Sequence, residues 1–297
     1  MIRCRRRDPR LALLPALLLL GAALPAFADD PAPAAPGGAD PAARAREIVE
    51  GRGEFEMVLI HGLGANATVW DDVLPFLKNT FRVAVFEFAG HGATQPIADD
   101  TIAKESERLR EFIAEHDFVY PTLVGHGMGG MIAMQYALDH PADVHRLIVI
   151  DAAPKQLATQ AEKAAVGEQL LGNYDRFVAA RYLQMSGDEA ISQRAMDMAL
   201  RTDSATFISL LMSSFDFDLT GRLNTLSVPL LVIGSEMMFP PADSSRHLLH
   251  HYGFSHARSL SFKRIAKAGH YVMLEQPVMT ASVLLAFGVT ADYQFDQ

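Results

Sequence analysis

The stretch Leu123-Val124-Gly125-His126-Gly127-Met128-Gly129-Gly130 joins a short apolar run to a dense group of glycines. The apolar residues predict a buried strand over 121–125, and the pattern after the glycines predicts a helix over 128–140. A strand that turns into a helix within two residues needs a backbone conformation that glycine reaches more easily than other residues. This turn is therefore the starting point for the fold.

Apolar and amphipathic segments alternate on both sides of this turn. Continuous runs rich in Val, Ile and Leu predict strands over 56–61, 82–88, 121–125, 146–151, 229–234 and 259–265. Helices are expected over 101–116, 128–140, 242–251 and 275–287. Strands that alternate with helices favour an α/β fold with a mostly parallel central sheet wrapped by helices.

One long segment interrupts the alternation. Residues 154–227 contain no convincing strand and are expected to form several helices, anchored by Phe177, Tyr182, Leu200, Phe207 and Leu211. An insertion between two strands of an open α/β sheet lies near the carboxyl edge, where such sheets bind ligands. We therefore expect a helical lid at 154–227, between a first core part at 51–153 and a second at 228–297.

The N-terminal residues have the pattern of an export signal. Five arginines within the first ten residues precede the apolar run 11–24, and Ala26-Phe27-Ala28 matches a small-residue cleavage site. The Ala-, Pro- and Gly-rich segment that follows predicts a flexible linker over 29–50. The sequence thus predicts a signal peptide at 1–28, a periplasmic or secreted protein, and no stable membrane anchor after cleavage.

Composition excludes several kinds of chemistry. The chain of 297 residues has a formal net charge of −9, which disfavours nucleic acid as a partner. Cys4 is the single cysteine, so neither an intramolecular disulfide nor a cysteine-rich zinc site is possible. His247, His250, His251 and His256 do not place three ligands on one helical face, so no metal site is predicted there, and no cofactor is expected.

Four motifs together resemble the α/β-hydrolase superfamily, in its lidded, single-domain branch. They are His61-Gly62-Leu63-Gly64, Gly90-His91-Gly92, the glycine-rich turn at 125–130, and Ala268-Gly269-His270-Tyr271. They occur in the order and spacing of that family over roughly residues 54–290. The antiparallel strands that usually open this fold are shortened or missing before Phe55. The resemblance implies descent from hydrolases of esters, lactones or other small acyl compounds.

The same resemblance implies roles for particular residues. In the family, a serine at the strand-to-helix turn attacks an acyl carbon, a histidine takes its proton, and an acid orients the histidine. His270 stands at the histidine position. The backbone N–H groups of Leu63 and Met128 are expected to form the oxyanion hole. The implied partner is a small acyl-type molecule in a pocket under the lid.

Two of these positions depart from the family's pattern. Gly127 occupies the nucleophile position and has no side chain. The usual acid position falls on Met237, which leaves Glu236 and Asp151 as alternative acids. Glycine adopts the strained backbone of this turn without a Cβ, so the fold does not require a serine. Our first hypothesis is therefore a protein that keeps the fold but has lost the serine acyl-enzyme mechanism: a pseudoenzyme, a small-molecule binder or an inactivated mutant.

Two other hypotheses follow from the same residues. In one, His270 activates a water molecule directly, provided that Asp151 or Glu236 orients its ring. In the other, Gly125, Gly127 and Gly130 form the dinucleotide-binding pattern G-x-G-x-x-G, with Asp151 as the acid that binds a ribose. The dinucleotide hypothesis leaves the other three motifs unexplained.

Overall fold

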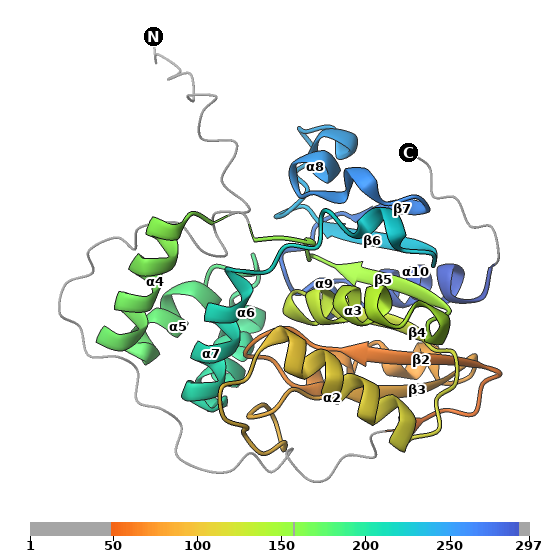
Figure 1. Cartoon of the computed structure of the whole chain (residues 1–297), viewed down its shortest axis with the longest axis horizontal. Helices are drawn as coiled ribbons and strands as arrows, with labels where there is room; N and C mark the ends of the chain where they lie inside the picture. The colour runs from red at the N-terminus through yellow and green to blue at the C-terminus, as the bar shows by residue number, and fades with distance from the viewer. Residues whose placement is uncertain (1–48, 157, 291–297) are drawn as a thin grey trace.

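The computed structural model describes residues 49–156 and 158–290. A seven-stranded sheet with the order β1-β3-β2-β4-β5-β6-β7 runs through the molecule (Figure 1). Only β1 is antiparallel to its neighbour among these strands. The strands are β1 (Val49–Glu50), β2 (Phe55–Ile60), β3 (Phe81–Phe86), β4 (Thr122–His126), β5 (Arg146–Ile150), β6 (Leu230–Ser235) and β7 (Leu260–Ile265).

Helices cover both faces of the sheet. They are α1 (Leu74–Leu77), α2 (Ile102–Glu115), α3 (Met128–Asp139), α4 (Gln160–Gly172), α5 (Tyr174–Tyr182), α6 (Glu189–Arg201), α7 (Ser204–Ser214), α8 (Ser245–His251), α9 (Val272–Glu275) and α10 (Pro277–Val289). Single 3₁₀ turns are η3 (Ala67–Trp70), η4 (Pro141–Asp143), η5 (Leu223–Thr225) and η6 (Phe254–His256). None of the helices in the described ranges is both long and apolar enough to cross a membrane.

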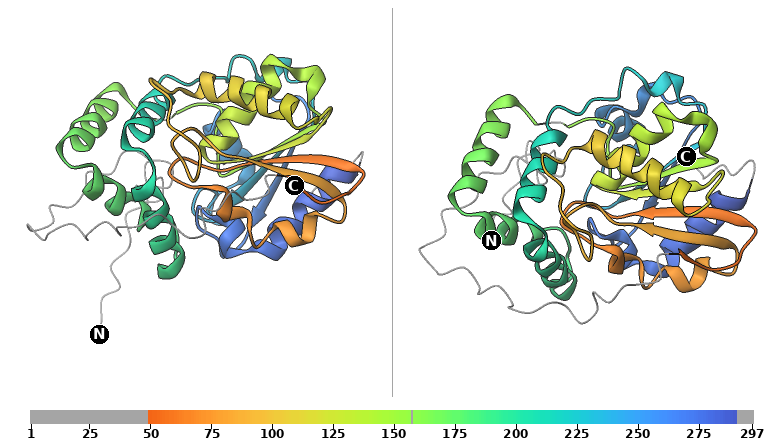
Figure 2. Two further views of the ribbon diagram at one scale, coloured as in Figure 1. Left: turned by 90° about the horizontal axis from the view of Figure 1, so that it is seen from below. Right: turned by 60° about the horizontal axis from the view of Figure 1, so that its bottom comes forward.

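The sheet has one apolar core on each face because successive residues of a strand point to opposite sides. In β2, Met57 and Leu59 pack into the core shared with α1 and α10, whereas Val58 and Ile60 pack into the core shared with α2 and α3. Figure 2 shows these two helical layers on either side of the sheet. Burial on both faces explains why the parallel strands are continuous apolar runs.

Helices α4–α7 form the insertion between β5 and β6 that the sequence predicts, and we call them the helical insertion. They lie together at one end of the sheet in Figures 1 and 2. Their buried side chains, including Phe177, Tyr182 and Phe207, belong to the same apolar core as α1 and α10. The insertion is therefore packed on the rest of the molecule through apolar contacts.

The α/β fold and its mostly parallel sheet are confirmed, while some boundaries differ. Val49 and Glu50, which were assigned to the linker, pair with β3 as the two-residue strand β1. The helix expected over 275–287 is split into α9 and α10, because Pro277 cannot continue α9 and instead begins a new helix. The predicted signal at 1–28, the linker up to residue 48 and the last residues, 291–297, lie outside the described residues.

Candidate active site

The strand-to-helix turn has the backbone conformation of a nucleophile elbow. β4 ends at His126, α3 begins at Met128, and Gly127 between them has φ 52° and ψ −119°. A Cβ at position 127 would lie 3.3 Å from Nε2 of His270 and 3.8 Å from the Cα of Gly62. A side chain at this position would therefore point at the imidazole, as a nucleophile must.

Asp151 orients His270 from the end of β5. Oδ2 of Asp151 lies 3.3 Å from Nδ1 of His270, and both side chains are buried. Asp151 also accepts hydrogen bonds of 2.6 Å from both the backbone N–H and the hydroxyl of Ser235. When Nδ1 carries the proton and donates it to Asp151, Nε2 is left as a proton acceptor facing Gly127. Two of the three parts of a catalytic triad are thus in place.

Of the two acids that the sequence left open, the structure selects Asp151. Glu236 instead lines a separate surface pocket with Asp188 and Lys267. It directly follows the last residue of β6, Ser235, whose hydroxyl holds Asp151 in the site. The proposal of Glu236 as the acid is wrong because its side chain belongs to that second pocket. Ser235 was not singled out from the sequence, where a single serine at the end of an apolar run gave no signal.

The two N–H groups that are predicted to form an oxyanion hole lie at the start of α3 and in the loop after β2. Met128 is the first residue of α3, so its N–H has no partner within the helix. Leu63 and Met128 both line the cavity beside Gly127. Among the turns, loops and helix caps of the described residues, neither the N–H of Leu63 nor that of Met128 donates to a backbone carbonyl. Two donors are therefore available for a developing negative charge.

The loop that carries Leu63 is held from two sides. The N–H of Gly64 donates to Nε2 of His91 over 3.0 Å, and the hydroxyl of Tyr182 in α5 donates to the carbonyl of Leu63 over 2.7 Å. Nδ1 of His91 lies 2.8 Å from the carbonyl of Ala89. His91 therefore has a positioning role, and Tyr182, which was predicted only as an apolar anchor, links the helical insertion to the oxyanion loop.

Three histidines near the site are kept neutral by burial. Burial lowers the pKa of His61 to about 4. The pKa of His91 is lowered to about 3 by burial and by the nearby His61. Burial and the charge of His270 hold the pKa of His126 well below its usual range. Neutral rings can accept hydrogen bonds at one nitrogen, as Nε2 of His61 does from the N–H of Phe88.

His126 has a place that the sequence did not indicate. Its Nε2 lies 2.9 Å from the carbonyl of His270, and the two ring centroids are 4.4 Å apart. Because Nε2 must donate to a carbonyl, Nδ1 carries no proton, and this atom is buried without a partner in the described structure. His126 thus supports the backbone of the catalytic histidine from behind the elbow.

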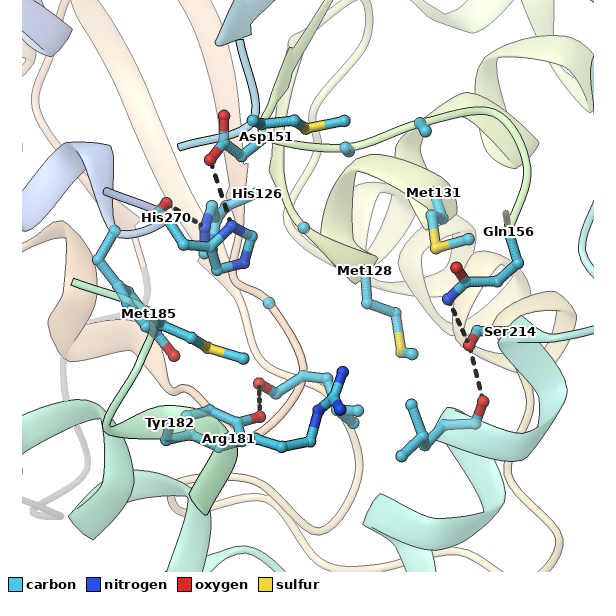
Figure 3. A pocket seen from close by; sticks show the side chains of 18 of the residues that line it. His126, Met128, Met131, Asp151, Gln156, Arg181, Tyr182, Met185, Ser214 and His270 are labelled. Atoms are coloured by element: carbon cyan, nitrogen blue, oxygen red, sulfur yellow. Dashed lines mark hydrogen bonds and ion pairs between the residues drawn. The ribbon is translucent and has the colours of Figure 1, made fainter. Parts of the chain in front are cut away.

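A cavity of about 120 Å³ lies between the elbow and the helical insertion. Gly127, Asp151 and His270 line it on the core side (Figure 3). Its wall is largely apolar and includes Met128, Met131, Met185, Phe177, Phe207 and Leu211. The methionines of the helical insertion and of the loop after β6 have different surroundings. Met185 and Met238 line the pocket, whereas Met196 and Met198 are part of the apolar core. This volume holds several waters or one small molecule.

The dinucleotide hypothesis does not fit this arrangement. Asp151, the proposed ribose ligand, is buried and already bonded to Ser235 and His270. A Cβ at Gly125 would lie 2.2 Å from the carbonyl oxygen of Gly129, and one at Gly130 would lie 2.5 Å from the Cβ of Ala152, so close packing accounts for these two glycines of the pattern. As for metals, no group of three or more His, Cys, Asp or Glu side chains in the described residues is arranged to hold an ion.

The fold and the site together define a class: an α/β protein in which a buried histidine, in contact with an aspartate, faces a glycine at the turn between a strand and a helix. A family model described as "Alpha/beta hydrolase family" matches residues 57–283. The chain belongs to the alpha/beta hydrolase family.

Three similar proteins illustrate the range of relatives. A pimeloyl-[acyl-carrier protein] methyl ester esterase of Vibrio cholerae is 27% identical over 70% of this chain and 86% of its own length. An uncharacterized protein of Mycobacterium tuberculosis is 38% identical over 32% of this chain, and the chain spans only 28% of that relative. A solved structure of a hydrolase from Oleispira antarctica has a TM-score of 0.72 at 18% identity, covering 80% of this chain and 92% of the other.

Proposed function

We propose that this protein binds a small acyl compound, such as an ester, in the cavity between the elbow and the helical insertion, and that it does not form a serine acyl-enzyme. The observation that carries the proposal is Gly127 at the elbow, where φ is 52° and no side chain faces Nε2 of His270. The esterase name of the Vibrio cholerae relative supports an ester or related acyl compound as the ligand. In this proposal the helical insertion acts as a lid.

A second candidate function is slow hydrolysis by water. The contact between Asp151 and Nδ1 of His270 favours it, because an oriented imidazole presents Nε2 as a general base. Nε2 would take a proton from water as its oxygen bonds to the carbonyl carbon. The N–H groups of Leu63 and Met128 would bind the resulting oxyanion. Collapse of this intermediate would then release the alcohol, which receives the proton from His270.

Hydrolysis of short-chain p-nitrophenyl esters tests both candidates. We expect the wild type to match the buffer rate and Gly127→Ser to gain turnover, because the serine would face an oriented histidine and an available oxyanion hole. The double variant Gly127→Ser/His270→Ala should lose that gain. Intact-protein mass spectrometry should show an acyl adduct on Gly127→Ser and none on the wild type.

The outcomes separate the two candidates. Wild-type turnover above buffer that disappears in His270→Ala would establish the water mechanism, for which general base catalysis accounts for roughly 10²- to 10⁴-fold. An acyl adduct on the wild-type protein would contradict both candidates. A failure of short esters to raise the Tm of the wild type would count against the binding proposal.

A further inference from the structure

The cavity wall opposite His270 carries a cation without a counter-ion. Arg181 extends from α5, and its guanidinium points into the cavity in Figure 3. Its Nη2 is fully buried and has no hydrogen-bond partner in the described structure. No carboxylate within the described ranges forms an ion pair with it. The Cζ of Arg181 lies 5.4 Å from the centroid of the Phe177 ring, in a cation–π contact.

Arg181 is partly exposed, but its Nη2 is fully buried without a partner, so this position of the guanidinium needs an explanation. Burial lowers the pKa of Arg181 to about 10, which still leaves the side chain protonated at neutral pH. A buried charge without a partner destabilises a protein by several kcal/mol unless a ligand completes its hydrogen bonds. Among the residues that line the cavity, Asp151 is the only carboxylate, and it already bonds to Ser235 and His270.

Neighbouring polar groups on the same wall suit an anionic group of the ligand. The amide nitrogen of Gln156 donates to the hydroxyl of Ser214 over 3.1 Å, and this hydroxyl in turn donates to the carbonyl of Leu211. Lys155, next to Gln156, also lines the cavity and forms no ion pair with a carboxylate of the described residues. A planar guanidinium with free donors matches the two oxygens of a carboxylate.

We propose that the ligand is an acyl compound that carries a carboxylate, and that Arg181 binds this carboxylate while the acyl carbon lies at the elbow. The inference rests on the proposed function, because it assigns a substrate class to the same cavity. It explains why a charged side chain is retained in an apolar wall. The small cavity limits the ligand to a compact monoester of a short dicarboxylic acid.

Binding of monomethyl succinate and dimethyl succinate to the full protein tests this inference. The two esters differ mainly in one negative charge. By calorimetry, we expect the wild type to bind the charged monoester at least tenfold more tightly, and Arg181→Met to lose this preference while still binding the neutral diester. Arg176→Met is the matched control, since Arg176 lies on the exposed side of the same helix.

Stability provides a second measurement. Without ligand, Arg181→Met should have a Tm at least as high as that of the wild type, because the substitution removes an unpaired buried charge. The monoester should raise the Tm of the wild type and of Arg176→Met, but not that of Arg181→Met. Equal binding of both esters, or a charge preference that survives in Arg181→Met, would overturn the carboxylate inference and leave the binding proposal intact. Absence of binding by either ester would overturn both.

Discussion

The absence of a side chain at residue 127 affects the backbone strain of the turn as well as the chemistry of the site. A φ of 52° with a ψ of −119° is a conformation that residues with a Cβ adopt only under strain. A serine here must be held by the surrounding structure. Hydrolases of this architecture therefore keep a strained residue for the sake of catalysis, and this chain is free of that strain.

Gly127→Ser and Gly127→Ala should both lower the free energy of unfolding by about 1–3 kcal/mol, because each places a Cβ on the strained backbone. A Cβ there would lie 3.3 Å from His270, a side-chain atom that can shift slightly, so neither variant should fail to fold. Urea unfolding would measure the difference. If either variant were as stable as the wild type, the argument for strain at the elbow would be wrong.

The sequence predicted part of the site at this scale and left part open. His270, Leu63 and Met128 could be placed because each follows a strand in a short motif. The acid was ambiguous, since the choice between Asp151 and Glu236 depends on how the end of β5 faces the loop after β6. Ser235 contacts Asp151 from 84 residues further along the chain, and Arg181 reaches the cavity from α5, and no local sequence pattern encodes either placement.

Among the elements, α3 is placed by how closely it approaches the sheet. Its first turn lies against the end of β2, where a Cβ at Gly129 would be 2.3 Å from the carbonyl oxygen of His61 and 2.6 Å from that of Ile60. Backbone atoms cannot move aside as a flexible side chain can. This contact keeps the N-terminus of α3 beside the oxyanion loop.

Gly129→Ala should therefore destabilise the protein by about 3 kcal/mol or more, the upper part of the range for overpacked cores. Gly172→Ala is the matched control, since Gly172 ends α4 and has open space around its Cα. Alanine is favoured over glycine in a helix by up to about 1 kcal/mol, so the control should be neutral or stabilising. Thermal unfolding would compare them. Similar Tm values for both variants would contradict the close approach of α3 and β2.

The main elements were predicted within a few residues because buried parallel strands are continuous apolar runs. The strand β1 was missed since two residues are too short to show a periodicity. The boundary at Pro277 was missed: the helix expected over 275–287 runs across this residue, whereas Pro277 opens α10.

For the whole molecule, buried titratable groups determine how stability depends on pH. The pKa values of His61, His91 and His126 are lowered by burial, so the folded protein does not take up protons between pH 6.5 and about 4, whereas the unfolded chain does. The free energy of unfolding should thus fall as the pH falls through this window.

The carboxyl of Asp100 has the opposite effect on the pH dependence of stability: it lowers the free energy of unfolding as the pH rises. Burial and the neighbouring carboxyl of Glu105 raise the pKa of Asp100 to about 8, so the folded state keeps a proton that the unfolded chain loses near pH 4. Its contribution to stability is complete below that pH and is lost as the pH rises towards 8. Between pH 4 and 6.5 the three histidines outweigh this one carboxyl, and above pH 6.5 deprotonation of Asp100 lowers the free energy of unfolding.

Urea unfolding at pH 5, 6.5 and 8 should therefore show a maximum of stability near pH 6.5. The variant Asp100→Asn should flatten the decline between pH 6.5 and 8 while keeping the loss towards pH 5. A stability that rises continuously to pH 8 in the wild type, or an identical profile for Asp100→Asn, would show that the Asp100 carboxyl is not protonated in the native state.

The contacts of the helical insertion have a consequence for the kinetics of exchange with solvent. The hydroxyl of Tyr182 holds the carbonyl of Leu63, and the carbonyl of Met185 accepts a 2.7 Å hydrogen bond from the N–H of His270. If the helical insertion acts as the proposed lid, its movement away from the sheet would break both bonds. Entry and departure of a ligand would then share one slow opening step, so residence time in the cavity would be long even for a compound of modest affinity.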